Sequence, residues 1–281
     1  IAQIADPAQF SLVFTSCGTE ADNQAIFSAA RRGNAVTTQG EHAAVFESYK
    51  ELKNRGVEPR FAPLHADGSV DADALLELVD EKTALVSVIH VSNETGAVND
   101  IAAIARRVKE KNPRAVFFSD GVQAFGKIPV RLTKDIDLYS VSAHKIGGLK
   151  GTGALVRRKG YAGLAPYLHG GGQENGLRSG TENVFGIACF EYAAREKFSA
   201  LEADAQRIEL GGILCLVQRS QRLRADLFQL FFHTTKISFF VIYKLIGAAK
   251  AKEKAFPPTK GDERPASAVP PAIRRTAHSN V

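Results

Sequence analysis

Three residues with reactive or phosphate-binding side chains stand together near the middle of the sequence. Ser142, His144 and Lys145 lie in SVSAHKIGGLKGTGAL, at the end of an apolar run and directly before glycines. Lys145 could be a solvated surface charge, a phosphate ligand or a catalytic amine. Small and apolar neighbours would take hydration from this amine and favour the neutral form that a Schiff base requires. No G-x-x-x-x-G-K-[ST] pattern precedes it, which argues against a P-loop lysine.

Two further groups of residues could belong to the same site as this lysine. Asp120 ends the apolar run AVFFSD, and an acid at the end of a buried strand needs a cationic partner. In TSCGTEADN, Gly18 and Thr19 open a helix, where free N–H groups favour a phosphate. Ordinary capping roles are the simpler alternatives at both places. We call the segment around Gly18 and Thr19 the phosphate turn. Taken together, the amine, the carboxylate and the phosphate turn fit pyridoxal 5'-phosphate (PLP), with the carboxylate facing the pyridinium nitrogen.

Alternating strand-like and helical patterns must position these groups. Apolar runs such as FSLVFTS and ALVSVIHVS (residues 84–92) predict strands, and residues 18–33 and 100–112 predict helices, the latter capped by Asp100. Nearly all-apolar strands alternating with helices indicate an α/β fold with a mostly parallel sheet covered on both faces. Ligands bind at the carboxyl ends of such strands, so the polar residues there should converge on one rim.

The charge distribution divides the chain. Residues 1–209 hold 24 Lys and Arg against 26 Asp and Glu, whereas residues 210–281 hold 12 against 4, which accounts for the net charge of +6. Because the basic character belongs to the last quarter alone, it does not indicate a nucleic-acid-binding protein. We therefore expect a PLP-binding large domain over residues 1–209 and an atypical basic, partly disordered tail over residues 210–281.

The composition also bears on where in the cell the protein is expected. A membrane span over Leu227–Ile246 is disfavoured because His233, Lys236 and Lys244 interrupt the apolar run, so a buried, aggregation-prone or unrelated segment is the simpler interpretation. The three cysteines form no C-x-x-C pair, and the chain opens without a secretory pattern. We expect a cytoplasmic protein with no metal site, no membrane association and no nucleic-acid partner.

The ordered motifs resemble those of the cysteine desulfurases of the nitrogen-fixation and iron-sulfur-cluster type, within the class V aminotransferases of fold type I PLP enzymes. The resemblance runs from about Ile1 to about Ile208. It rests on the motifs VFTSCGTEADNQAI, EHAAV, HVSNETGAVNDI, DGVQAFGKIPV, SVSAHKIGGLKGTGAL and GGGQENGLRSGTENVFGIA, of which the last is the most discriminating. Against this family the chain is expected to be truncated at both ends, with its small C-terminal domain missing or replaced.

The resemblance implies a role for each matching residue. Lys145 would form the Schiff base with PLP and act as general base on the substrate, and Asp120 would bind the pyridinium nitrogen. His42 would stack on the ring. The remaining cofactor contacts would be Gln123 to the phenolic oxygen, Asn93 to cofactor and substrate, Gly18, Thr19, Ser142 and His144 to the phosphate, and Thr181 to the phosphate of a partner subunit.

The implied function is conversion of L-cysteine to L-alanine, with the sulfur passing to an enzyme cysteine and then toward iron-sulfur cluster assembly. A homodimer and a scaffold or sulfur-acceptor protein are the implied partners. The sequence departs from the family because no small-residue S-x-A-C motif follows Leu210, so sulfur transfer is expected to be impaired. Another class V activity, transamination or selenocysteine lyase chemistry, and a non-catalytic remnant are the alternatives.

Cys17 stands where the family usually has glycine. If this turn requires a positive φ, its Cβ costs roughly 1 kcal/mol. Replacing it by glycine would then raise cofactor affinity.

Overall fold

The computed structural model describes residues 1–207. The expectations for the basic tail and for Leu227–Ile246 fall on residues outside this range. Among the described residues, no helix is both long and apolar enough to cross a membrane.

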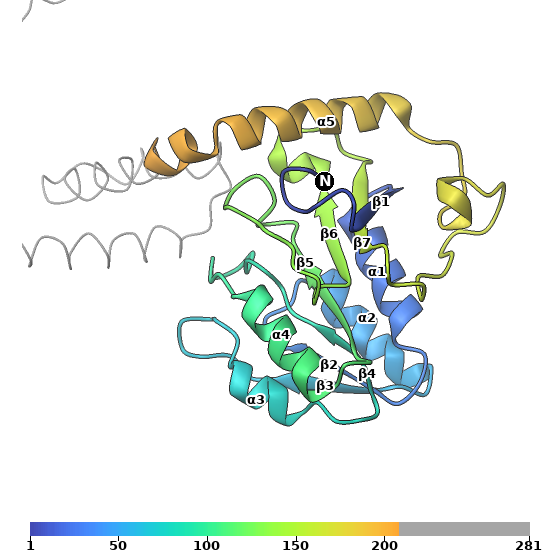
Figure 1. The fold of residues 1–281 in the computed structure, drawn as a ribbon, viewed down its shortest axis with the longest axis vertical. Coiled ribbons are helices and arrows are strands. Elements are labelled where there is room, and N and C mark those ends of the chain that lie inside the picture. Colours follow the sequence, from blue (N-terminus) through green and yellow to red (C-terminus); the bar gives the residue numbers. More distant parts are fainter. Residues whose placement is uncertain (208–281) are drawn as a thin grey trace, which may run out of the picture.

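A single seven-stranded sheet forms the centre of the described chain (Figure 1). Its strand order is β1-β7-β6-β5-β4-β2-β3. The five strands from β6 to β3 run parallel, while β7 is antiparallel to both β6 and β1. The strand bounds are β1 Phe10–Thr15, β2 Asn34–Thr38, β3 Glu58–Ala62, β4 Thr83–Ser87, β5 Val116–Asp120, β6 Leu138–Ser142 and β7 Gly153–Arg158.

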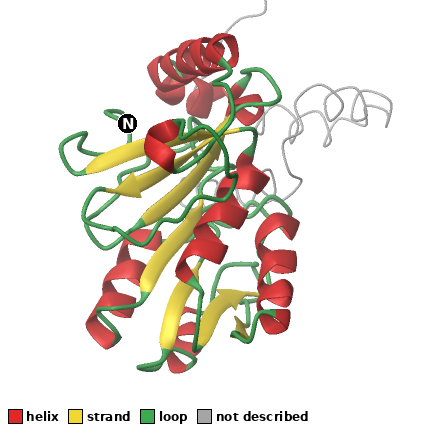
Figure 2. Cartoon of the chain, turned by 90° about the vertical axis from the view of Figure 1, so that its right-hand side faces the viewer, coloured by secondary structure: helices red, strands yellow, loops and turns green. Residues whose placement is uncertain are grey.

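Helices cover both faces of the sheet, as the sequence predicts (Figures 1 and 2). One buried cluster joins Ala25 and Ile26 of α1 and Tyr49 of α2 to the inward side chains of the strands. The other joins Leu75 of α3 and Ile104 of α4 to the opposite face. The helix bounds are α1 Gly18–Ala29, α2 Ala43–Asn54, α3 Ala72–Glu77, α4 Ile101–Lys111 and α5 Val184–Ser199.

Strand side chains supply both clusters alternately, because successive residues of a strand point to opposite faces. In β5, Phe117 belongs to the cluster under α4 and Phe118 to the cluster under α1, and both are fully buried. A sheet covered on both faces therefore needs the nearly continuous apolar strands that the sequence shows.

Two predicted boundaries are wrong and one is confirmed. β4 ends at Ser87 rather than at residue 92. Val88 N and His90 N still donate to the carbonyls of Phe118 and Asp120 at 3.1 and 2.9 Å, and the chain then bends at His90. The first helix ends at Ala29 rather than at Gly33, whose positive φ of 74° serves the turn into β2. Asp100 caps α4 as expected, its carboxylate accepting from Ala103 N at 3.0 Å.

Candidate active site

Asp120 and Lys145 follow neighbouring strands at the same edge of the sheet. β5 ends at Asp120, whose register partner on β6 is Ser140, and Lys145 lies in the short 3-10 turn Ala143–Ile146 directly after β6. Gly147, at φ 92°, ends this turn in a left-handed conformation that favours glycine. Asp120 is buried, and the Lys145 side chain is half-buried. The carboxyl edge thus carries both groups that the sequence predicts for it.

The phosphate turn before α1 packs against the same edge. A Cβ built on Gly18 would lie 2.9 Å from Cγ2 of Val122 and 3.5 Å from Cβ of Ser142. Val122 follows Asp120 and Ser142 precedes Lys145, so this turn packs directly against the strand ends of the site. A side chain at position 18 would collide with Val122 and prevent this packing. Ser142 is itself paired with His144, with 2.9 Å between Oγ and Nδ1. The structure therefore brings Gly18, Ser142 and His144 together at the start of α1.

An ion pair unforeseen from the sequence fixes this turn. Arg178, from the GLRSGTEN segment, donates from Nε to Oε1 of Glu20 at 2.8 Å. Glu20 also accepts from Ser16 N at 2.9 Å. Burial alone would raise the pKa of Glu20, but the hydrogen bonds from Arg178 and Ser16 outweigh it and leave that pKa lowered. The most discriminating motif of the sequence is thereby tied to the turn before α1.

Three carboxyl groups lie close to this site, two of which the sequence did not single out. Asp22 of α1 is 1% exposed, and burial raises its pKa well above the usual range, with the charge of Asp120 adding to the shift. Burial likewise raises the pKa of Asp120, opposed by the Val122 N–H and by the charges of His42 and Lys145. Burial raises the pKa of Glu41 to about 8. A helical pattern cannot show that Asp22 faces inward toward another acid.

His42 lies close to two of these acids, Asp22 and Asp120. It caps α2, its Nδ1 accepting from Ala44 N at 3.1 Å. Single ligand atoms of Asp22, His42 and Asp120 all lie within 4.8 Å of one another. This arrangement brings an imidazole to the predicted ring-binding carboxylate, although 78 residues separate them in the chain.

His90 and Tyr139 pack next to Asp120, and His90 N donates to the Asp120 carbonyl at 2.9 Å. His90 Nδ1 lies 2.9 Å from the Tyr139 hydroxyl, and burial lowers the pKa of His90 to about 4, so this imidazole is neutral at physiological pH. A Cβ on Gly121 would come within 1.9 Å of the Tyr139 ring. Gly121 is thus the residue that lets the chain turn directly after Asp120.

The four other predicted ligands lie around the edge. Thr19, the second residue of α1, is exposed beside Gly18. Asn93, in the loop after β4, donates to Glu94 at 2.7 Å, and Gln123 accepts from Lys127 Nζ. Thr181 is exposed and lines a small cavity of about 140 Å³ together with Ser16 of the phosphate turn. Asn93 and Gln123 follow the strands of the site, whereas Thr181 faces its outer surface.

The expectation for Cys17 is wrong. Its φ is −170° and its ψ is 173°, an extended conformation that any residue adopts. The position that requires glycine is instead Gly153, since a Cβ there would lie 2.5 Å from the carbonyl carbon of Cys17. Cys17 and Cys189, on α5, are both half-buried free thiols.

These residues fit PLP. The Asp120 carboxylate is buried, forms no ion pair within residues 1–207, and would be offset by a pyridinium cation. Lys145 provides an amine at the next strand end, and the turn at Gly18 offers N–H groups at the start of a 12-residue helix.

The fold and this donor set define the large domain of a fold type I PLP enzyme. A model of the "Aminotransferase class-V" family matches residues 2–209, and the chain belongs to this PLP-dependent family.

Within the family, the chain is similar to cysteine desulfurases. It is 41% identical over 207 residues to a cysteine desulfurase of Nostoc sp. (strain PCC 7120), covering 72% of this chain and 51% of the relative. A mitochondrial cysteine desulfurase of Arabidopsis thaliana is 41% identical over 208 residues, covering 70% and 45%. The chain spans about half the length of the curated relatives it matches.

Solved structures give the same result. A NifS-like protein superposes with a TM-score of 0.69 at 39% identity, covering 73% of this chain and 59% of that one. The structure of SspA in complex with cysteine superposes with a TM-score of 0.61 at 32% identity, covering 66% and 55%.

Proposed function

We propose that this chain binds PLP through Lys145 and transfers sulfur from L-cysteine to a thiol, leaving L-alanine. The observation that carries the proposal is the joint placement of Lys145 and Asp120 at neighbouring strand ends, with the Gly18 turn packed against them. The 41% identity to cysteine desulfurases and the cysteine bound by the related SspA support the choice of substrate.

When bound, PLP supplies an electron sink that stabilises negative charge on the substrate Cα. The chain's own residues supply the rest. The Lys145 amine removes the Cα proton and later returns a proton, Asp120 holds the ring nitrogen, and His42 covers the ring. Asn93 and Gln123 orient the cofactor, and Gly18, Thr19, Ser142 and His144 hold its phosphate. In the net reaction the carbon–sulfur bond breaks, a thiol RSH becomes the persulfide RSSH, and alanine leaves.

We further propose that the working unit is a homodimer in which Thr181 reaches the cofactor phosphate of the partner subunit. Val184 and Phe185, at the start of α5 and three and four residues after Thr181, are each 73% exposed. Large apolar side chains this exposed favour a protein interface. The physiological sulfur acceptor would be a protein thiol such as that of an iron-sulfur scaffold. A free thiol requires a reducing compartment, for which we propose the cytoplasm.

The test measures alanine formed from L-cysteine by the PLP-loaded protein, with dithiothreitol as the sulfur acceptor. We expect turnover by the wild type, and none by Lys145→Ala. Borohydride reduction followed by intact-mass measurement should show covalently attached PLP in the wild type alone. Lys150→Ala, an exposed lysine five residues further on, is the matched control. Equal alanine formation by wild type and Lys145→Ala would contradict the proposal.

A further inference from the structure

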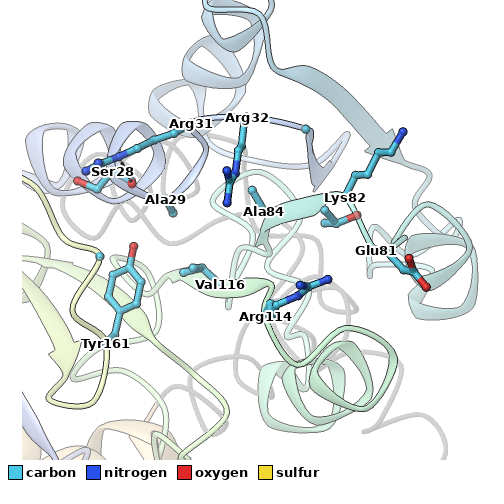
Figure 3. Close-up of a pocket in the computed structure, with 13 residues that line it drawn as sticks. Ser28, Ala29, Arg31, Arg32, Glu81, Lys82, Ala84, Arg114, Val116 and Tyr161 are labelled. Carbon is cyan, nitrogen blue, oxygen red and sulfur yellow. Dashed lines mark hydrogen bonds between the residues drawn. The ribbon is translucent and has the colours of Figure 1, made fainter.

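A second cavity opens at the opposite edge of the sheet. It has a volume of about 730 Å³ and lies between the end of α1 and the amino ends of β4 and β5 (Figure 3). Val116, at the start of β5, lines it, whereas Asp120, at the end of β5, belongs to the candidate active site. Four residue steps along a strand separate the two by about 13 Å. The cavity is therefore distinct from the proposed cofactor site.

Basic side chains dominate the walls of this cavity. Arg31, Arg32, Lys82 and Arg114 line it, and Glu81 is the only acid among the described residues that do so. None of the four cations forms an ion pair with another residue of the described range 1–207. In Figure 3, Arg32 reaches into the space above Ala84 and Val116, while the Lys82 amine turns outward. The cavity thus concentrates positive charge that the protein itself leaves uncompensated.

The floor of the cavity is apolar. Ala29, Ala84 and Val116 line it, together with the ring of the half-buried Tyr161. The Tyr161 hydroxyl points toward the end of α1 in Figure 3. Burial raises the pKa of Tyr161 to about 12, with Asp137 adding to the shift and Arg31 opposing it, so this hydroxyl is a neutral donor at physiological pH. The volume lies within the range of small-molecule sites, which combine apolar walls with a few convergent polar groups.

A buried hydrogen-bond network fixes the loops that carry these cations. Asn34, after Arg32 and Gly33, donates to Asp80 Oδ1 at 2.8 Å and accepts from Thr83 Oγ1 at 2.7 Å. Asn112 Nδ2 donates to the carbonyl oxygens of Asp80 and Thr83 at 2.9 and 3.0 Å, and its Oδ1 accepts from Arg114 N at 3.0 Å. The loops before β2, β4 and β5 are therefore joined into one unit, and their basic residues are held around the cavity in advance of any ligand.

We propose that this cavity binds an organic polyphosphate, a compound in which two or more phosphates are linked to a flat aromatic group. Guanidinium groups bind phosphate oxygens in a bidentate manner, which suits Arg32 and Arg114 on facing walls. The Tyr161 ring and Val116 provide the surface for the flat group. A nucleoside diphosphate has this chemistry, and its size suits the cavity.

The experiment is a calorimetric titration of the PLP-loaded full chain with ADP and with inorganic pyrophosphate. PLP saturation keeps the cofactor's own phosphate site filled. We expect ADP to bind, and pyrophosphate to bind more weakly because it lacks the flat group. The double variant Arg32→Gln/Arg114→Gln should weaken ADP binding at least tenfold. The matched control is Arg131→Gln, an exposed arginine outside the cavity, which should bind ADP like the wild type.

Thermal unfolding of each variant separates lost binding from lost folding. A folded double variant with wild-type ADP affinity, an equal loss in the Arg131→Gln control, or no ADP binding by the wild type would overturn the proposal. Pyrophosphate binding as tight as that of ADP would overturn its organic part. Since the readout is ADP affinity rather than alanine formation, failure here leaves the proposed sulfur transfer unaffected.

Discussion

The two edges of the sheet carry opposite kinds of charge. At the carboxyl edge, Asp22 and Asp120 are buried and the pKa of each is raised. At the amino edge, Arg32 and Arg114 are exposed around a cavity whose wall, within residues 1–207, contains Glu81 as its one acid. The same sheet thus carries buried acids at its carboxyl edge and exposed cations around the cavity at its amino edge.

The difference shows how burial decides what a charge can do. Burying a carboxylate is costly without a cation, so the carboxyl edge is suited to a cationic ring and an amine. Exposed arginines keep their hydration, so leaving them unpaired adds little to the free energy of the folded state. The amino edge can therefore carry these cations without acidic partners. Substitutions at each edge should therefore affect different measurements.

The largest effect is expected from Asp120→Asn. Asparagine keeps the acceptor for Val122 N, which lies 2.9 Å from Oδ1, but removes the charge that holds the pyridinium. Breaking a buried ion pair costs about 3–5 kcal/mol, so alanine formation should fall about 100-fold or more. Asp73→Asn, which breaks only an exposed pair with Arg107, should keep its activity. Unchanged turnover of Asp120→Asn would show that the carboxyl edge does not hold the ring.

The second effect concerns Glu41→Gln. Because the folded protein raises the pKa of Glu41 from 4.5 to about 8, the folded chain binds this proton more tightly than the unfolded chain. Its contribution favours folding at low pH and is lost as the pH rises from about 4.5 to about 8. Glutamine cannot ionise, so the variant should be more stable than wild type at pH 8 by on the order of 4 kcal/mol.

Urea unfolding of the cofactor-free protein at several pH values measures this. Glutamine retains the oxygen that accepts from Thr38 and Ile89. The exposed Glu77→Gln is the control and should follow the wild-type pH curve. A Glu41→Gln curve parallel to that of the wild type would contradict the expectation.

A smaller effect is expected at the amino edge from Asn112→Ala. Removing the amide takes one donor from the part-buried carbonyl of Asp80, which keeps Thr83 N at 3.1 Å, and one from the buried carbonyl of Thr83. This should lower the free energy of unfolding by about 2 kcal/mol. The variant that remains folded should bind ADP more weakly and PLP normally. Asn54→Ala, whose exposed amide bonds Glu51, is the control. An equal loss of PLP affinity would show that the two edges are coupled.

The smallest effect is expected from Cys17→Gly. The extended backbone at Cys17 gives glycine no advantage, and glycine costs the folded state roughly 0.5–1 kcal/mol through unfolded-chain entropy. PLP affinity, measured by fluorescence titration, should change less than twofold. A marked gain in affinity would show that the Cys17 side chain hinders the cofactor after all.

Much of the carboxyl edge was predictable, because its residues follow apolar runs. Asp120, Ser142 and Lys145 end or follow strands, and the rule that parallel strands end at one edge brings them together. Asp22 and Glu41 were not found, since a buried acid inside a helix or turn looks like a surface acid until its neighbours are known. The cavity of Arg32 and Arg114 was missed because its residues come from three separate loops.

The sequence by itself determined the α/β class, the PLP-binding pattern and the family, because each depends on local periodicity and on motifs within short segments. The tertiary structure alone decided that Arg178 pairs with Glu20, that Asp22 adjoins Asp120, and that Asn34 and Asn112 join three loops. These contacts join residues far apart in the chain. Their energies depend on burial and distance, which only the packed fold defines.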